Sequence, residues 1–160
     1  MPKPPISRPW ETRCDMRLPQ KALEYRRNHS PQLTTLQHLG ALNITAWLYR
    51  DANGMEDILV NPNTTIAQLT AQFGPAQTRD AEVGFHSEGR AAEWFRLRPR
   101  FQVLQIFSER IPCRKMCAPL LNHYYAGVPW FYYFDPYSWR GPEGEMVMRA
   151  GQVLKSAYGL

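Results

Sequence analysis

The pattern of hydrophobic and polar residues predicts two short helices near the start of the chain. Residues 18–40 have helical composition, with a break at Ser30-Pro31. Gly40 stands where a helix-ending glycine is expected. We therefore predict two helices, the second of which ends at Gly40.

Strand periodicity begins directly after this region. Apolar and other residues alternate through 42–49, in the order Leu42, Asn43, Ile44, Thr45, Ala46, Trp47, Leu48 and Tyr49. Alternation of this kind is the two-residue period of a β-strand. The Asp-Ala-Asn-Gly cluster at 51–54 predicts a turn, and residues 58–60 predict a second strand, so we expect a β-hairpin.

The rest of the chain alternates between predicted helices and strands. Thr64 or Thr65 can cap a short helix that Gly74-Pro75 ends. A helix starting near Phe85 and closed by Pro99 comes next, and the remaining elements follow in the order strand 103–107, helix after Pro112, strand 128–134 and helix 145–157. This order after a hairpin predicts an α/β fold in which helices pack against a mixed sheet.

Length and composition are those of one domain. The 160 residues, with 44% apolar character, can bury a single core. Residues 1–12 are rich in proline and are expected to form an extended lead-in or linker, which leaves 13–160 as the domain. The longest apolar stretches are too short to span a bilayer, and the first residues do not resemble a signal peptide. We expect a monomer without a membrane span.

A histidine, a glutamate and two cysteines form the pattern that carries chemistry. His86 and Glu88 stand two residues apart, and Cys113 and Cys117 follow later in the chain. Catalytic zinc sites have three protein ligands and an open position for water, beside a carboxylate that moves protons without binding the metal. His86, Cys113 and Cys117 are therefore the predicted ligands of Zn²⁺, and Glu88 is the predicted catalytic residue.

The spacing of the cysteines suits the first turn of a helix. Cys113 and Cys117 are four residues apart, so they lie on one face of a helix that begins after Pro112. A helix N-terminus favours the thiolate form, which is the form that binds metal. In the preceding helix, Glu88 shares a face with Phe95, which predicts an inward carboxylate. A buried carboxylate is costly unless it has a partner or a role.

Non-catalytic interpretations of the cysteines remain open. Free cysteines are commonly small, buried, apolar side chains. A structural zinc site is another possibility, although it normally needs four protein ligands and the third cysteine, Cys14, is remote in the sequence. Because the metal claims two of the three cysteines, no disulfide framework is left, which suits a reducing cytosol. The other histidines have no comparable context and are expected to be structural or exposed; they are His29, His38 and His123.

A net charge of +5 favours a polyanionic partner. Much of the positive charge follows the His-x-Glu pair or surrounds the cysteines, at Arg90, Arg96, Arg98, Arg100, Arg110, Arg114 and Lys115. Such arginines are also common as solvent-exposed residues at helix ends, so the charge alone does not establish nucleic-acid binding.

These residues resemble the nucleic acid and nucleotide deaminase superfamily, over about residues 42–160. Ser108-Glu109-Arg110-Ile111-Pro112-Cys113 is similar to the Ser/Thr-Glu-x-x-Pro-Cys run of bacterial polymorphic-toxin deaminases, and residues 86–95 look like the same clade. Within it, the chain resembles the SsdA-like single-stranded DNA cytosine deaminase toxins. The resemblance implies a three-layer α/β/α, cytidine-deaminase-like fold. Its mixed sheet would have about five strands, with helices on both faces and a zinc site at two helix N-termini.

A second resemblance concerns the substrate. Residues 132–137, Tyr-Tyr-Phe-Asp-Pro-Tyr, are similar to the Tyr-x-Tyr-Asp-Pro run of AID/APOBEC enzymes. This likeness implies that Tyr132, Asp135 and Tyr137 contact the substrate, although such aromatic residues are also common in ordinary strands. Asn43 and Asn61, near the hairpin strands, are further candidates for contacts to the nucleotide, or else turn or edge residues.

Together these patterns predict a zinc-dependent cytosine deaminase that converts C to U in single-stranded DNA. The resemblance implies a toxin module, secreted as part of a larger protein, delivered to the target-cell cytoplasm and blocked by a cognate immunity protein. An RNA or free-nucleoside deaminase acting on cytidine or adenosine is the enzymatic alternative. A zinc-stabilised nucleic-acid-binding module and an inert interaction domain are the non-enzymatic alternatives. Cytosine and adenine deamination use the same zinc and glutamate, so the target base stays open.

Overall fold

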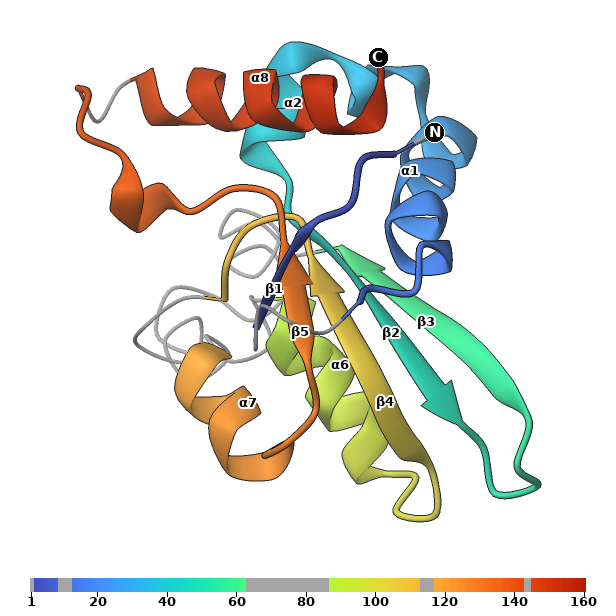
Figure 1. Ribbon diagram of the computed structural model, residues 1–160. Helices are drawn as coiled ribbons and strands as arrows, with labels where there is room; N and C mark the ends of the chain where they lie inside the picture. The colour runs from blue at the N-terminus through green and yellow to red at the C-terminus, as the bar shows by residue number, and fades with distance from the viewer. Residues whose placement is uncertain (1, 9–12, 63–86, 113–116, 143–144) are drawn as a thin grey trace, which may run out of the picture.

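The computed structural model describes residues 2–8, 13–62, 87–112, 117–142 and 145–160. These residues form a mixed α/β fold, in which helices pack against a mixed β-sheet (Figure 1). The fold class predicted from the alternation of helices and strands is therefore confirmed. The helix expected between Thr64 and Gly74 lies outside the described residues.

The sheet joins its strands in the order β1-β5-β4-β2-β3. Strand β2 (Ile44–Arg50) lies between β3 (Glu56–Pro62) and β4 (Gln102–Ser108) and runs antiparallel to both. Strand β5 (Trp130–Tyr132) is parallel to β4, and the short strand β1 (Ile6–Arg8) pairs antiparallel with β5. Because β3 and β4 both oppose β2, the strands β3, β4 and β5 run in the same direction.

The predicted hairpin is confirmed as β2 and β3. Ala46 lies opposite Val60 in this pair. In the turn, Gly54 has a φ of +82°, a left-handed backbone conformation that glycine adopts without steric strain. The Asp51 carboxylate accepts hydrogen bonds from the backbone N–H groups of Asn53 and Met55, at 2.8 and 3.0 Å. The Asp51 side chain thus satisfies backbone N–H groups within the turn that the sequence cluster predicted.

The predicted break at Ser30-Pro31 is also confirmed. Helix α1 (Arg17–His29) ends at this point, and a 3₁₀ helix η1 (Pro31–Thr34) leads into α2 (Leu36–Ala41). The expectation that Gly40 ends the second helix is wrong, because α2 continues to Ala41 and Leu42 caps it.

Gly40 instead allows two helices to touch. Helix α8 (Met146–Tyr158) packs across α2 (Figure 1). A Cβ atom on Gly40 would collide with the backbone carbonyl of Val147, and one on Gly151 would collide with that of Leu36. Glycines on both sides of the contact therefore let the two backbones approach.

One apolar cluster lies between the sheet and helices α1, α2 and α8. Strand β2 contributes Ile44, Ala46 and Leu48 to it, and β4 contributes Phe107. The opposite face of the sheet carries a second cluster, under α6 (Ser87–Arg96) and α7 (Cys117–Tyr124). Its buried members are Trp47, Tyr49, Ala91, Phe95, Val103, Ile106 and Leu121. Strand alternation in β2 thus supplies both clusters, which explains why nearly all of its residues are buried.

The proline-rich start of the chain lies against the domain. The backbone N–H of Lys3 donates to the carbonyl of Ala157 in α8, and the Tyr133 hydroxyl donates to the carbonyl of Lys3. Residues 6–8 then pair with β5. The sequence predicted an extended segment here and no strand.

Candidate functional site

The carboxyl ends of three strands lie at one edge of the sheet. Strands β3, β4 and β5 end there at Pro62, Ser108 and Tyr132, and the oppositely directed β2 begins there. Ligands of open α/β sheets commonly bind outside the carboxyl ends of the strands. We call this the carboxyl edge.

Helices α6 and α7 lie side by side on one face and begin toward this edge. The residues after α6 turn directly into the amino end of β4, so α6 runs away from the carboxyl edge (Figure 1). Helix α7 connects the carboxyl end of β4 to the amino end of the parallel strand β5, so it runs in the same sense.

The predicted metal ligands belong to the segments that enter these two helices. His86 and Cys113 lie outside the described residues. Glu88 is the second residue of α6 and Cys117 the first of α7, but their side chains also lie outside the described part. Among the side chains that the structure does describe, no three of His, Cys, Asp or Glu lie close enough together to share a metal ion.

Buried and half-buried polar side chains lie together at the carboxyl edge. Thr45 and Ser108 face each other across β2 and β4 and are almost fully buried. Asn43, just before β2, donates from Nδ2 to Ser108 Oγ at 3.2 Å. The backbone N–H of Arg110 donates to Asn43 Oδ1 at 3.0 Å. We call Asn43, Thr45, Ser108 and Arg110 the edge cluster.

The edge cluster lies on the face that carries α6 and α7. Trp47 and Ile106 belong to the apolar cluster under those helices. Side chains two residues apart in a strand share a face, so Thr45 lies on that face with Trp47, and Ser108 lies there with Ile106. The sequence had singled out Asn43 but not Thr45 or Ser108; a buried polar residue inside a strand of apolar neighbours is the signal that marks them.

The other candidate substrate contacts lie near the carboxyl ends of β3 and β5, and their side chains differ in exposure to solvent. Asn61 pairs with Thr45 across β2 and β3, and its backbone carbonyl accepts from the Thr45 hydroxyl at 3.4 Å. Tyr132 ends β5 and is only 5% exposed. Asp135 accepts from the backbone N–H of Tyr137 and from the Ser138 hydroxyl, both at 2.8 Å. The Asp135 carboxylate therefore orders the 3₁₀ turn η2 (Pro136–Ser138), in which Tyr137 is half-buried.

The glutamate of the Ser-Glu-x-x-Pro-Cys run points to the other face of the sheet. Glu109 is fully buried and pairs with Arg26 of α1, with N–O distances of 2.6 and 2.9 Å. It also accepts from the Tyr158 hydroxyl at 2.6 Å and from the backbone N–H of Ile44 at 3.0 Å. Burial, together with the charge of Glu109, raises the pKa of Tyr158, so this hydroxyl stays protonated and donates.

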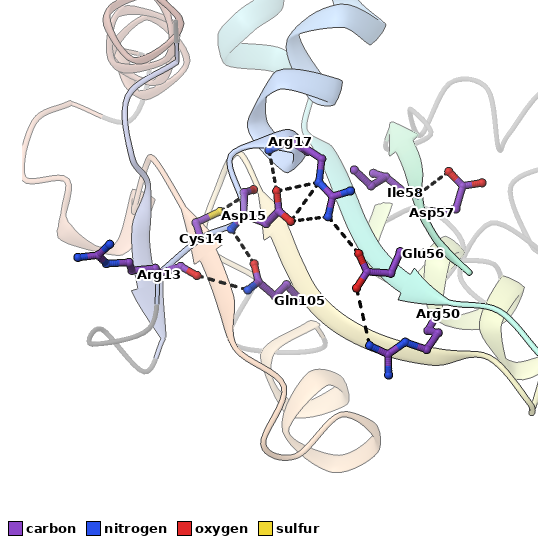
Figure 2. A network of polar contacts seen from close by, with 9 residues as sticks. All are labelled: Arg13, Cys14, Asp15, Arg17, Arg50, Glu56, Asp57, Ile58 and Gln105. Atoms are coloured by element: carbon purple, nitrogen blue, oxygen red, sulfur yellow. Dashed lines mark hydrogen bonds and ion pairs between the residues drawn. The ribbon is translucent and has the colours of Figure 1, made fainter. Parts of the chain in front are cut away.

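Cys14 also lies on that other face, away from the edge cluster. It packs against the cluster under α1, and burial raises the pKa of its thiol to about 12. Figure 2 shows why this segment is fixed: Gln105 bonds to the backbone of Arg13 and Asp15, at 3.3 and 2.8 Å. Asp15 in turn pairs with Arg17, at 2.7 Å. A thiol whose pKa is raised in this way stays protonated near neutral pH, which makes it a poor nucleophile.

Arg96 and Arg98, two of the arginines that follow the His-x-Glu pair, lie toward the opposite edge of the sheet. Arg96 pairs with Glu93 at 2.6 Å, and the guanidinium of Arg98 stacks on Trp94 at 3.8 Å from the ring centroid. A pocket of about 620 Å³ lies there, between the ends of α6 and α7 and the start of β4. Its lining includes Phe95, Arg96, Arg98, Phe101, Val103, Leu120, Tyr124 and Tyr125. Proximity in the sequence therefore did not place these charges at the carboxyl edge.

No family model, curated protein or solved structure matches this chain. In the described part of the chain, no helix combines the length and apolar character needed to cross a membrane.

Proposed function

We propose that the protein is a zinc-dependent deaminase that converts cytosine to uracil in single-stranded DNA. The observation that supports the proposal is that α6 and α7, the two helices entered by the motif segments, lie on one face of the sheet and both run away from its carboxyl edge. Helix α6 follows His86 and contains Glu88, and α7 begins at Cys117. Polar side chains of the edge cluster lie on the same face of the sheet, and a pocket for a polar base would need such hydrogen-bonding groups.

In this proposal His86, Cys113 and Cys117 hold the metal. Zinc bound by one nitrogen and two thiolates supplies a water molecule acidic enough to ionise near neutral pH. Glu88 accepts the proton of that water and delivers it to the ring nitrogen of the base. The water oxygen becomes bonded to C4, and the exocyclic amine leaves as ammonia once Glu88 has returned a proton to it. Cytosine and water thus give uracil and ammonia.

The substrate assignment rests on charge and on the resemblance to toxin deaminases. The net charge of +5 favours a polyanion. A deaminase reaches its target base only when the base is unstacked, which makes a single strand the least costly substrate. On the same resemblance, we propose that the domain acts as an interbacterial toxin, delivered to the target-cell cytoplasm and inhibited by a cognate immunity protein.

Uracil formation tests the proposal directly. Purified protein is incubated with single-stranded DNA, duplex DNA, RNA and free cytidine, and uracil and bound zinc are measured. We expect uracil in single-stranded DNA, and a rate about 10²–10⁴-fold lower for Glu88→Ala with zinc retained, because Glu88 is not a ligand. Cys113→Ala should lose the metal, whereas Cys14→Ser, which changes a remote cysteine, should keep both zinc and activity.

Other outcomes would redirect the assignment. A Cys113→Ala protein with full zinc content and full activity would refute the ligand set. Product only from RNA or from free cytidine would select the alternative substrates. Zinc binding without any product would favour a zinc-stabilised nucleic-acid-binding module.

A further inference from the structure

Arg110 carries a half-buried guanidinium group, two of whose nitrogens form no hydrogen bond with the part of the chain that the structure describes. These two nitrogens, Nε and Nη2, are themselves buried. Burial lowers the pKa of Arg110, yet a guanidinium group does not lose its proton in a protein. Leaving two buried N–H donors of a charged group without acceptors is unfavourable, which points to a ligand that accepts from them.

The carboxylate of the preceding residue, Glu109, is already occupied. Glu109 uses one oxygen to accept from Arg26 and Ile44, and the other to accept from Arg26 and Tyr158. Arg26 is thereby matched by a bidentate pair, with further bonds from its guanidinium to the backbone carbonyls of Leu33 and Leu42. Both Glu109 oxygens are therefore occupied by Arg26, Ile44 and Tyr158, and Nε and Nη2 of Arg110 do not bond to this carboxylate.

The position of Arg110 fits a ligand at the carboxyl edge. Glu109 faces α1, so strand alternation turns Arg110 to the face of Ser108, under α6 and α7. The backbone is held on both sides: the Arg110 N–H donates to Asn43, and Arg110 forms a parallel bridge with Phe134. The side chain thus extends from a fixed backbone at the carboxyl edge.

We propose that Arg110 binds a phosphate group of the nucleotide whose base enters the site. The planar fork of guanidinium N–H groups matches the oxygens of a phosphate, and such charge-assisted bonds are strong where water is excluded. This inference rests on the proposed function and narrows it to phosphorylated substrates. The phosphate could belong to a polynucleotide or to a free nucleotide, and the experiment separates these sources.

Binding is measured in the Glu88→Ala background, so that it does not depend on turnover. The probe is a fluorescent single-stranded oligodeoxynucleotide, titrated at several salt concentrations. Arg110→Met should weaken binding about 10- to 100-fold and lower the slope of log Kd against log salt by about 0.7, as expected for one lost phosphate contact. The matched control is Arg27→Met, an exposed arginine of α1 on the other side of the sheet, which should change neither quantity.

Thermal unfolding separates a ligand-binding role from a structural one. Without nucleic acid, Arg110→Met should unfold about 2–8 °C higher than the parent, because methionine removes an unmatched buried charge. A structural arginine would give the opposite sign. Arg110→Lys keeps the charge without the fork and should bind with intermediate affinity, which provides a second variant should Arg110→Met fail to fold.

Competition distinguishes the two phosphate sources. If the contact is to the phosphate of the target nucleotide itself, deoxycytidine monophosphate should displace the oligonucleotide from the parent at lower concentration than deoxycytidine does, and this preference should vanish in Arg110→Met. If only the oligonucleotide loses affinity, the assignment to the target nucleotide is wrong and the contact is to a phosphate of a neighbouring nucleotide in the strand. Unchanged oligonucleotide affinity and salt slope in a folded Arg110→Met protein would overturn the inference. Absence of deamination by the wild type would instead refute the proposed function, and the binding result would still decide the role of Arg110.

Discussion

Arg26 and Arg110 are two arginines near the carboxyl edge whose guanidinium groups differ in their hydrogen-bond partners. Arg26 is fully buried, and Glu109 and backbone carbonyls surround it. Arg110 has buried guanidinium nitrogens that no described group accepts from. The first environment is that of a structural ion pair, and the second is the observation on which the proposed phosphate contact rests.

Glu109→Gln should destabilise the protein by about 3–5 kcal/mol, because it leaves the Arg26 charge buried and uncompensated. Urea denaturation followed by circular dichroism measures this change. The control is Glu56→Gln, which breaks exposed ion pairs to Arg17 and Arg50 and should cost about 0–1 kcal/mol. Equal losses for the two variants would mean that the Glu109 pair does not stabilise the fold.

At the scale of single residues, the sequence identified motifs but not their orientation. Ser108 and Glu109 are adjacent members of one motif, yet strand alternation sends them to opposite faces, where one joins the edge cluster and the other an ion pair. A motif read as a unit cannot separate these roles. Arg26 was detectable in principle, because it continues the buried stripe of Leu18 and Ala22 along α1 at helical spacing.

At the scale of elements, the contact between α2 and α8 depends on backbone proximity. Gly40 and Gly151 stand where the carbonyl groups of the opposite helix leave no room for a Cβ atom. Both glycines lie inside helices, where glycine lowers intrinsic helix stability by about 1 kcal/mol relative to alanine. Packing therefore outweighs helix propensity at this crossing.

Gly151→Ala should lower the free energy of unfolding by about 1–3 kcal/mol, because the helices must separate to admit the methyl group. Helix propensity alone predicts a gain, so the sign of the change is decisive. Gln152→Ala, at the exposed neighbouring position of α8, should stay within about 0.5 kcal/mol of the parent. Chemical denaturation of the three proteins checks the prediction, and a more stable Gly151→Ala protein would contradict it.

Local patterns predicted most elements, and long-range contacts explain the discrepancies. The hairpin and the helix break follow from turn residues and periodicity, which are local properties. Strand β1 was not predicted, because its partner β5 lies far along the chain and three residues carry no clear period. Gly40 looked like a helix end because the sequence does not show that α8 crosses there.

At the scale of the whole molecule, one sheet separates two apolar clusters, and one of them packs under the helices of the candidate site. Helices α6 and α7 cover one face, and α1, α2 and α8 lie toward the other (Figure 1). Both clusters contain buried residues of β2, so loss of either should destabilise the shared sheet. Only the cluster under α6 and α7 supports the helices that carry Glu88 and Cys117.

A matched pair of core substitutions tests whether this face holds the proposed zinc site. Leu121 of α7 and Leu154 of α8 are both buried, on opposite faces. Each Leu→Ala change should cost about 2–5 kcal/mol of stability, measured by urea denaturation. Leu121 lies one helical turn after Cys117, so Leu121→Ala should also weaken zinc binding about 10-fold, by loosening the helix that presents the ligand.

Leu154→Ala provides the control for stability itself. It should lower the free energy of unfolding by a similar amount and leave the zinc dissociation constant close to that of the wild type, measured by competition with a chelating dye. If both variants lose zinc affinity equally, metal binding follows global stability and the local argument fails. If only Leu121→Ala loses affinity, the packing of α7 on the sheet positions the metal ligand, as expected for a site at the start of that helix.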